Sequence, residues 1–323
     1  MSTDPVPEPR ETIGRIERDG SALDSLIAPQ ARIEKLADGF TWSEGPVWIR
    51  EGRYLLLSDV PANRMYRWSE RDGLSVFLEP SGHASIAPAG FREPGSNGLV
   101  RGPGNSILMA DHGNRAVARL DLATRTKTFL ATHHEGRRFN SPNDLVQGRD
   151  GSIYFTDPPY GLDGLNASPL KEIAYNGVYR IAPGGGVELL EKGMSFPNGI
   201  VLSRDERTLY VANSDPERAV IMAFDLGAGG RLTRGRVFAD MTELARSGLP
   251  GLPDGMAVDM DGNLFATGPG GVHVFTPGGE RLGRIDTGTA IANCAFGEDG
   301  RTLFLTSKHM LARIRTRTTG FNY

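Results

Sequence analysis

Six polar residues occupy one position in a pattern that recurs along the chain. At each copy an Asn, Asp or Glu precedes a short apolar run, a turn follows about eight positions later, and a second apolar run comes after the turn. In the clearest copy, Asn143 precedes Leu145 and Val146, and the turn lies at 148–151. The residues at this position are Glu44, Asn97, Asn143, Asn198, Asp254 and Asn293. Carboxylate and amide oxygens are ligands that hard cations such as Ca²⁺ prefer, so this set could bind a metal if the fold brings it together.

The spacing of the copies predicts the fold. Successive polar residues are separated by 53, 46, 55, 56 and 39 residues, a period that suits a blade of four strands. Leucine-rich and ankyrin repeats are much shorter. Six copies in 323 residues therefore predict an all-β chain folded as a six-bladed β-propeller.

The repeat also predicts the domain boundaries. We expect residues 31–323 to form a single propeller domain and residues 1–30 to form an N-terminal extension with a short helical segment over 21–27. The last copy, after Asn293, supplies only about three strands. The alternating segment 31–37 is typical of a strand, and we expect it to be the missing fourth. The two ends of the chain would then close the last blade and leave no open sheet edge in the ring.

Composition excludes several classes of partner. The net charge of −3 argues against a nucleic-acid-binding surface, and no apolar stretch approaches the ~20 residues of a membrane span. The single cysteine, Cys294, cannot form an internal disulfide and lies in an apolar run, so we expect it to be buried and inert. Residues 1–10 contain acidic residues and no apolar core, unlike a secretory signal, which favours a cytoplasmic location. The sequence gives no indication of the oligomeric state.

Propeller geometry predicts where the polar residues meet. The first strand of each blade lines the central channel, so the six side chains should point at one region on the axis. The second strand returns toward the same face, which places His112 there. A long loop over 157–176 carries Tyr160, and loops longer than about 12–15 residues are often binding loops.

Such a ring of polar side chains has three candidate roles. It could hydrate a narrow channel, bind a divalent metal, or recognise a protein partner, although a protein partner would favour aromatic and Arg anchors. Two carboxylates that converge in a confined space repel each other, and burial adds to the cost. A bound dication removes both problems, which favours the metal site over the hydrated channel.

Several motifs carry a resemblance to a known family. They are Glu44-Gly45-Pro46-Val47-Trp48, Ser141-Pro142-Asn143-Asp144, Phe196-Pro197-Asn198-Gly199 and Pro253-Asp254-Gly255-Met256. These motifs resemble the signatures of the gluconolactonase/regucalcin (senescence marker protein) family, and segments 110–115 and 154–161 resemble its bacterial gluconolactonase branch. The resemblance spans roughly residues 31–315 in chain order. It implies a six-bladed propeller with one catalytic divalent ion that hydrolyses sugar lactones of the glucono-1,5-lactone type.

The resemblance also assigns roles to individual residues. Its metal ligands match Glu44, Asn143, Asn198 and Asp254, and its catalytic carboxylate matches Asp254. Ca²⁺ is the expected ion, with Mg²⁺, Mn²⁺ and Zn²⁺ as alternatives. A dication there would polarise a lactone carbonyl as a Lewis acid while Asp254 accepts a proton from water as general base, or attacks as a nucleophile. Ser141 departs from the regucalcin-like pattern, which has an Arg there, so substrate contacts built on that Arg do not carry over.

Three further residues are candidates for binding the lactone. Asn97 shares the ring position and could face substrate or water, and we expect the substrate side. His112 could contact substrate or could be a turn histidine without a role. Tyr160 is a candidate for the rim of the site, with packing of its own loop as the alternative.

Two other functions remain open at this stage. A phosphotriesterase-type hydrolase is the alternative on the same fold, as in diisopropyl fluorophosphatase, which is similar in fold and metal site. The other is a propeller that binds a small ligand or a partner without catalysis. Acidic residues at both Glu44 and Asp254 favour an enzyme, because a pure scaffold needs neither.

Overall fold

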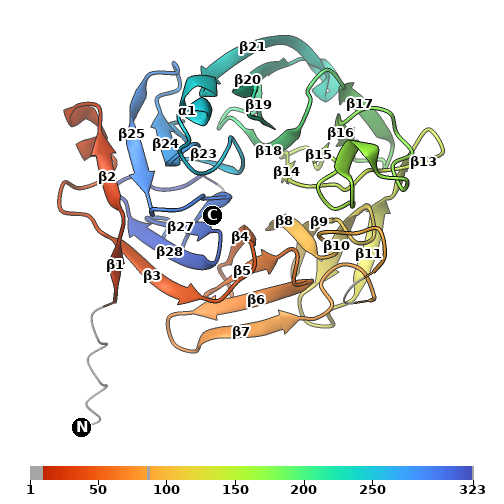
Figure 1. Cartoon of the computed structure of the whole chain (residues 1–323), viewed down its shortest axis with the longest axis horizontal. Coiled ribbons are helices and arrows are strands. Elements are labelled where there is room, and N and C mark those ends of the chain that lie inside the picture. Colours follow the sequence, from red (N-terminus) through yellow and green to blue (C-terminus); the bar gives the residue numbers. More distant parts are fainter. Residues whose placement is uncertain (1–9, 86–87, 322–323) are drawn as a thin grey trace.

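The computed structural model describes residues 10–85 and 88–321, and these fold into six small antiparallel sheets around a central axis (Figure 1). The six-bladed propeller predicted from the repeat is confirmed. Its only α-helix among the described residues is α1 (Thr242–Arg246), and no described helix is long and apolar enough to cross a membrane.

Each blade contributes four strands to the ring. The first two blades contain β4 (Ser43–Ile49), β5 (Tyr54–Asp59), β6 (Arg64–Ser69) and β7 (Gly73–Leu78), then β8 (Ser96–Arg101), β9 (Ser106–Asp111), β10 (Ala116–Asp121) and β11 (Lys127–Ala131). The next two contain β14 (Leu145–Gln147), β15 (Ile153–Asp157), β16 (Gly177–Ile181) and β17 (Val187–Glu191), then β18 (Pro197–Leu202), β19 (Thr208–Asp215), β20 (Arg218–Leu226) and β21 (Leu232–Asp240). The fifth contains β22 (Met256–Val258), β23 (Leu264–Gly268), β24 (Gly271–Phe275) and β25 (Arg281–Asp286).

The sixth blade joins the two ends of the chain, as the strand count predicted. It contains β26 (Asn293–Gly297), β27 (Thr302–Ser307) and β28 (Met310–Arg315), and its fourth strand is β3 (Ile33–Asp38). Strand β3 pairs antiparallel with β28, with Ile33 opposite Ile314. The predicted closure of the last blade is therefore confirmed, and the ring has no open edge at that blade.

The N-terminal extension packs against the propeller along its described residues. Strand β1 (Thr12–Ile13) pairs with β3 of the sixth blade, and β2 (Arg15–Arg18) pairs with β25 of the fifth. The helical segment expected over 21–27 is a short 3₁₀-helix, η1 (Ser21–Ser25). Leu23, Leu26 and Ile27 are buried in the core between the fifth and sixth blades. The extension thus adds a strand to each of two sheets, which the repeat pattern did not indicate.

The hydrophobic core lies between neighbouring blades. Each second strand is buried on both of its faces, and for this reason segments such as Leu55–Leu57 are continuous apolar runs without alternation. One cluster joins Val47 and Leu56 of the first blade to Ile107 and Met109 of the second. Comparable clusters fill the other interfaces around the ring. Cys294 is buried in one of them, and burial raises the pKa of its thiol.

Smaller elements lie on the connections. A hairpin of β12 (His133–His134) and β13 (Arg137–Arg138) follows the second blade, and η2 (Leu165–Ala167) lies in the long loop before β16. A 3₁₀ turn, η3 (Ala228–Gly230), precedes β21. The long loop after β15 was predicted from the sequence. This loop and the long connection between β7 and β8 both contribute residues to the central cavity.

Candidate active site

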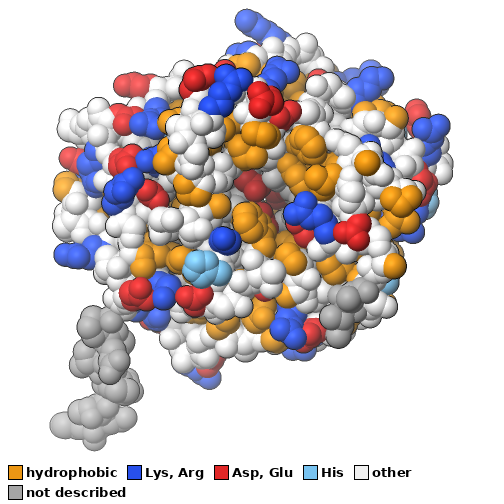
Figure 2. Space-filling view, in the orientation of Figure 1, with side chains coloured by type: hydrophobic (Ala, Val, Ile, Leu, Met, Phe, Trp, Pro, Cys, Tyr) orange, Lys and Arg blue, Asp and Glu red, His pale blue; other side chains and the backbone are white. Residues whose placement is uncertain are grey.

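The repeat-position residues converge at one end of the central channel. A cavity of about 490 Å³ opens there, and its lining includes Glu44, Asn97, Asn143, Asn198 and Asp254. Figure 2 shows the ring hollowed at its centre, with acidic side chains inside the hollow and hydrophobic side chains around its mouth. The structure therefore brings five of the six residues to one cavity. The sixth, Asn293, lies deeper in the channel and donates from Nδ2 to Glu44 Oε2 at 3.3 Å.

Glycines beside the ring residues let the blades approach closely. Gly45 has a positive φ of 50°, and a Cβ there would lie 2.1 Å from the backbone oxygen of Asn97 in the next blade. A Cβ on Gly199 would lie 2.0 Å from the backbone oxygen of Asp254. Only glycine fits such positions. The glycines that follow Glu44 and Asn198 therefore mark close contacts between blades.

Hydroxyl groups at the ends of second strands hold the backbone of the ring. Ser58 Oγ donates to the backbone oxygen of Asn97 at 2.9 Å, and Thr156 Oγ1 donates to that of Asn198 at 2.7 Å. Each bond links one blade to the first strand of the next. The ring side chains thus project from a backbone that neighbouring blades hold in place, which is the support that a preorganised site requires.

Two carboxyl groups of this ring, Glu44 and Asp254, line the same cavity. Glu44 is almost fully buried, and burial raises the pKa of its carboxyl to about 7, although hydrogen bonds from Gly45, Asn293 and Trp42 oppose the rise. Asp254 is partly exposed to the cavity. Burial, followed by the charges of Glu44 and Asp144, raises the pKa of Asp254 well above its ordinary value. Keeping both carboxylates ionised in the site therefore costs free energy, which a bound cation or a proton can offset.

The amide side chains form a directed hydrogen-bond chain along the cavity floor. Asn97 Nδ2 donates to Asn143 Oδ1 at 2.8 Å, Asn143 Nδ2 donates to Asn198 Oδ1, and Asn198 Nδ2 donates to Ser214 Oγ at 2.9 Å. Ser214 Oγ in turn donates to the backbone oxygen of Pro253, next to Asp254. An amide oxygen has two lone pairs, so Asn198 Oδ1 can accept its bond from Asn143 and still bind a cation.

His112 lies beneath the cavity floor and does not line its wall. Its side chain is fully buried, Nε2 lies 3.1 Å from Asn143 Oδ1, and Nδ1 lies 3.6 Å from Glu93 Oε2 without a hydrogen-bond partner. Burial lowers the pKa of His112 to about 4, so the imidazole is neutral at pH 7. The neutral imidazole of His112 can hold the side chain of Asn143 in one orientation.

Tyr160 reaches the rim of the cavity from the loop after β15. Its ring stacks on Phe196 with centroids 5.8 Å apart, and burial followed by the charge of Asp254 raises the pKa of its hydroxyl. The loop is fastened from below by Ser141, whose Oγ donates to the backbone oxygen of Pro158 at 2.6 Å. Ser141 itself is fully buried and takes no part in the cavity lining.

Glu93 and Arg92 also line the cavity, and sequence reasoning did not find them. They belong to the connection between β7 and β8, which follows no repeat, so no register could indicate their position. Burial raises the pKa of Glu93 to about 7, while the charge of Arg92 opposes the rise. The only signal in the sequence was the unusual length of this connection.

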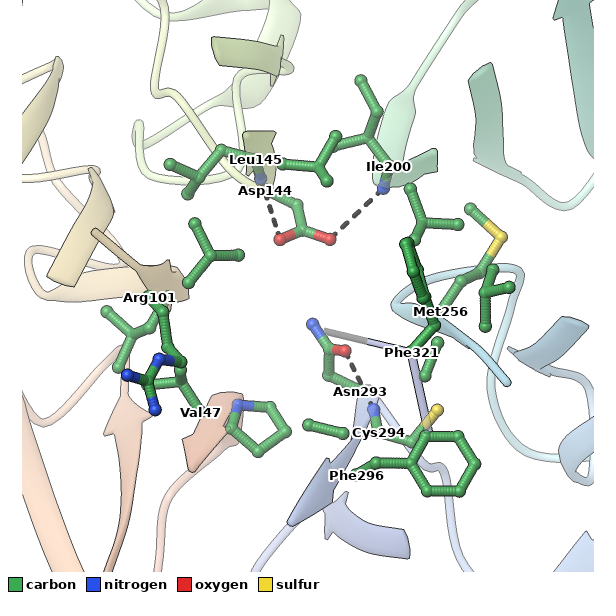
Figure 3. A pocket seen from close by; sticks show the side chains of 18 of the residues that line it. Val47, Arg101, Asp144, Leu145, Ile200, Met256, Asn293, Cys294, Phe296 and Phe321 are labelled. Carbon is green, nitrogen blue, oxygen red and sulfur yellow. Dashed lines mark hydrogen bonds between the residues drawn. The ribbon is translucent and has the colours of Figure 1, made fainter. Parts of the chain in front are cut away.

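The other end of the channel is narrow and mostly apolar. A passage of about 140 Å³ there is bordered by later residues of the same first strands, including Val47, Leu145 and Ile200, and by Phe321 from the C-terminal segment. Figure 3 shows Asp144 and Asn293 pointing toward the middle of this passage. Asp144 accepts hydrogen bonds from the backbone N–H groups of Leu145 and Ile200 at 2.9 and 3.2 Å.

The donor set of the cavity determines which cation it could hold. Within residues 10–85 and 88–321, no three His, Cys, Asp or Glu side chains form a cluster that could bind a metal ion. A cation in this cavity would therefore depend on amide oxygens in addition to the carboxylates of Glu44 and Asp254. The carboxylates of Glu44 and Asp254 and the amide oxygens of Asn143 and Asn198 would give four oxygen donors. Such a set suits a hard divalent ion with flexible coordination, such as Ca²⁺.

Comparisons with known proteins agree with this architecture. Residues 42–309 match the protein family described as SMP-30/gluconolactonase/LRE-like region. A gluconolactonase of Zymomonas mobilis is 48% identical over 313 residues, which cover 96% of this chain and 88% of that protein. A pentonolactonase of Haloferax volcanii is 28% identical and covers 82% of this chain and 80% of that protein. The structure of a gluconolactonase from Xanthomonas campestris superposes with a TM-score of 0.81 at 32% identity and covers 97% of this chain and 99% of that one.

Proposed function

Because the chain belongs to the SMP-30/gluconolactonase/LRE-like family, we propose that this lactone hydrolase opens a sugar lactone of the glucono-1,5-lactone type to the aldonic acid, with the help of a divalent cation. The convergence of Glu44 and Asp254 on one cavity with two Asn amides is the observation that carries the proposal. A sugar lactone is small enough for a cavity of about 490 Å³.

We assign the cation to the oxygens of Glu44, Asn143, Asn198 and Asp254, and we propose Ca²⁺ as the ion. When bound, such a cation supplies Lewis-acid polarisation of the lactone carbonyl. The hydrogen-bond chain from Asn97 to Ser214 would hold the amide oxygens of Asn143 and Asn198 in place for it. His112 would support Asn143 from below.

Asp254 is the residue that we propose handles the proton. Its carboxylate borders the cavity, so it can reach a water molecule beside a bound lactone. It accepts a proton from water as the water oxygen bonds to the lactone carbonyl carbon. The bond from that carbon to the ring oxygen then breaks, and the ring oxygen takes the proton from Asp254 and becomes a hydroxyl of the aldonic acid.

A covalent route through Asp254 is the alternative for the same carboxylate. In that route an Asp254 oxygen attacks the carbonyl carbon, and the ring oxygen leaves and takes a proton from water, which gives a mixed anhydride between Asp254 and the aldonic acid. Water then attacks the Asp254 carbonyl carbon of the anhydride and releases the aldonic acid. A single turnover in ¹⁸O-labelled water separates the two routes. General-base catalysis places the label in the aldonic acid, whereas the covalent route places it first in the Asp254 carboxylate, which peptide mass spectrometry detects.

One experiment tests the reaction and the cation together. The protein is stripped with a chelator and assayed on a panel of aldonolactones and a panel of organophosphate triesters, with and without added Ca²⁺. We expect lactone hydrolysis to be lost on stripping and restored by Ca²⁺, with little activity on the triesters. Full lactone hydrolysis after thorough stripping would refute the cation, and faster turnover of triesters would favour the phosphotriesterase alternative. No hydrolysis in either panel would favour a non-catalytic binding protein.

A further inference from the structure

We propose that Glu93 is a specificity-determining residue whose carboxylate accepts hydrogen bonds from the ring hydroxyls of the lactone, so that the site prefers polyhydroxylated lactones to bare ones. This inference rests on the proposed function, because it names a feature of the substrate of the same cavity.

Glu93 occupies a wall of the cavity that the repeat does not build. It belongs to the connection between β7 and β8, and its side chain is only 14% exposed. It lines the same cavity as Asp254 and Tyr160. Apolar residues, among them Leu252 and Ile291, supply other parts of this lining. The carboxylate of Glu93 is therefore placed where it can contact a molecule bound in the cavity.

The side chain of Glu93 is held by one neighbour and retains free acceptor capacity. Arg92 Nη2 lies 3.1 Å from Glu93 Oε1, whereas the buried His112 Nδ1 lies 3.6 Å from Oε2 and forms no hydrogen bond with it. A carboxylate has about four lone-pair sites, so the contact with Arg92 leaves room for hydroxyl donors. Adjacent hydroxyls of a sugar lactone could donate one hydrogen bond to each oxygen. Hydrogen bonds to an ionised acceptor are among the stronger ones in proteins.

The backbone that carries Glu93 is fixed to the opposite loop. The N–H groups of Arg92 and Glu93 both point at the backbone oxygen of Gly161, at 3.1 and 3.4 Å, and Phe91 forms a β-bridge with Leu162. Gly161 donates in turn to Ser141 Oγ at 2.9 Å. The connection between β7 and β8 and the Tyr160 loop are therefore joined, and a specificity residue needs this kind of fixed support.

The test compares two lactones that share the reacting ester. Glucono-1,5-lactone carries ring hydroxyls, and δ-valerolactone has the same six-membered ring without them. We expect Glu93→Ala to lower kcat/KM for glucono-1,5-lactone by about 10–100-fold, mainly through KM, as the loss of charged hydrogen bonds predicts. Its kcat/KM for δ-valerolactone should stay within about twofold of the parent, because that substrate has no hydroxyl for Glu93 to accept from.

Matched variants separate recognition from folding. Glu93→Gln keeps one acceptor oxygen and the shape of the side chain, so its loss on glucono-1,5-lactone should be smaller than that of Glu93→Ala. Glu79→Gln is the control on the same connection, because Glu79 pairs with Arg64 at 2.7 Å and does not line the cavity. Equal losses on both lactones, or no loss on either, would overturn the assignment of Glu93.

A binding measurement keeps this inference distinct from the proposed function. Calorimetry with D-gluconolactam, an amide analogue with the same hydroxyls, measures recognition without turnover. We expect Glu93→Ala to weaken binding by a factor similar to its effect on KM, and unchanged binding would overturn the inference. A parent protein that hydrolyses neither lactone yet binds the lactam through Glu93 would refute the proposed function and leave this inference standing.

Discussion

The two ends of the axial channel are built by the same six strands and differ in almost every property. At one end Glu44, Asn143 and Asn198, which lie at or just before the starts of these strands, surround a cavity of about 490 Å³. At the other end they continue as Val47, Leu145 and Ile200 around a passage of about 140 Å³. Long connections add Glu93 and Tyr160 to the first end, whereas the C-terminal segment adds Phe321 to the second.

This difference shows that one set of strands can supply polar residues to a cavity at one end and apolar packing between blades along the rest of its length. Apolar residues along the first strands hold the blades together, and their polar first residues are left facing a space that the strands alone cannot fill. The loops at that end then decide what the space admits. The predictions below test whether the two ends are as independent as their composition indicates.

The largest effect should come from removing the proposed base at the cavity end. We expect Asp254→Asn to lower kcat on glucono-1,5-lactone by about 10²–10⁴-fold, the range that a general base contributes. Circular dichroism and the melting temperature should change little. Asp205→Asn, in an exposed turn of the fourth blade, is the control and should keep full activity. Parent-level turnover by Asp254→Asn would rule out this role.

A second effect at the same end concerns cation binding. Glu44→Gln keeps the shape of the side chain and removes its charge, so we expect Ca²⁺ affinity to fall by about tenfold or more. Titration calorimetry on the stripped protein measures this without any turnover. Glu51→Gln is the matched control, since Glu51 is exposed and pairs with Arg101. Equal affinities of the parent and Glu44→Gln would contradict the assigned ligand.

The pH dependence of stability should also reflect the crowded carboxyls of the channel. Burial raises the pKa of Glu44 and Glu93 to about 7 and that of Asp144 to about 8. The folded state therefore holds more protons than the unfolded state between about pH 4 and 8, and its stability falls as pH rises through that window. His112 and His273 have pKa values lowered to about 4, and their opposite contribution is complete above about pH 6.5.

The measurement is therefore made between pH 6.5 and 8. We expect the melting temperature of the stripped protein to fall across this interval by about 2 °C or more, and added Ca²⁺ to reduce the fall. Glu44→Gln removes one of the raised carboxyls and should flatten the slope. A melting temperature that rises with pH in the stripped parent would show that these carboxyls do not dominate.

The smallest effect on activity should come from the narrow end. Phe321 donates its backbone N–H to the backbone oxygen of Val258 at 2.8 Å, and the guanidinium of Arg149 lies 5.3 Å from the centroid of its ring. We expect Phe321→Ala to cost about 1 kcal/mol of stability through lost burial and to leave kcat/KM within about twofold of the parent. A tenfold loss of activity at unchanged stability would mean that the two ends are coupled.

Sequence reasoning succeeded where the geometry repeats. The spacing from Glu44 to Asn293 predicted the number of blades, and the incomplete last copy predicted that segment 31–37 supplies its fourth strand, which the structure has as β3. The same register brought Glu44, Asn143, Asn198 and Asp254 to one cavity. Their roles as ligands and base remain proposals. Successive blades have the same four-strand arrangement, so one position in the pattern corresponds to one place in space.

Sequence reasoning was less informative about segments that have no counterpart in other blades. The extension was assigned no place in the sheets, yet β1 and β2 each add a strand to one. His112 was expected on the cavity face, and it lies under the floor because its blade buries it against Asn143. Ser141 was noticed only as a departure from a family pattern, and the structure shows it fastening the Tyr160 loop.

By itself the sequence determined that six equivalent strands would present polar residues to a common axis, because a strict repeat forces equivalent positions into equivalent places. Only the tertiary structure decided the walls of the cavity, including the position of Glu93, the direction of the amide chain and the narrowness of the far end. These features depend on contacts between segments far apart in the chain. No local pattern or spacing encodes the geometry of such contacts.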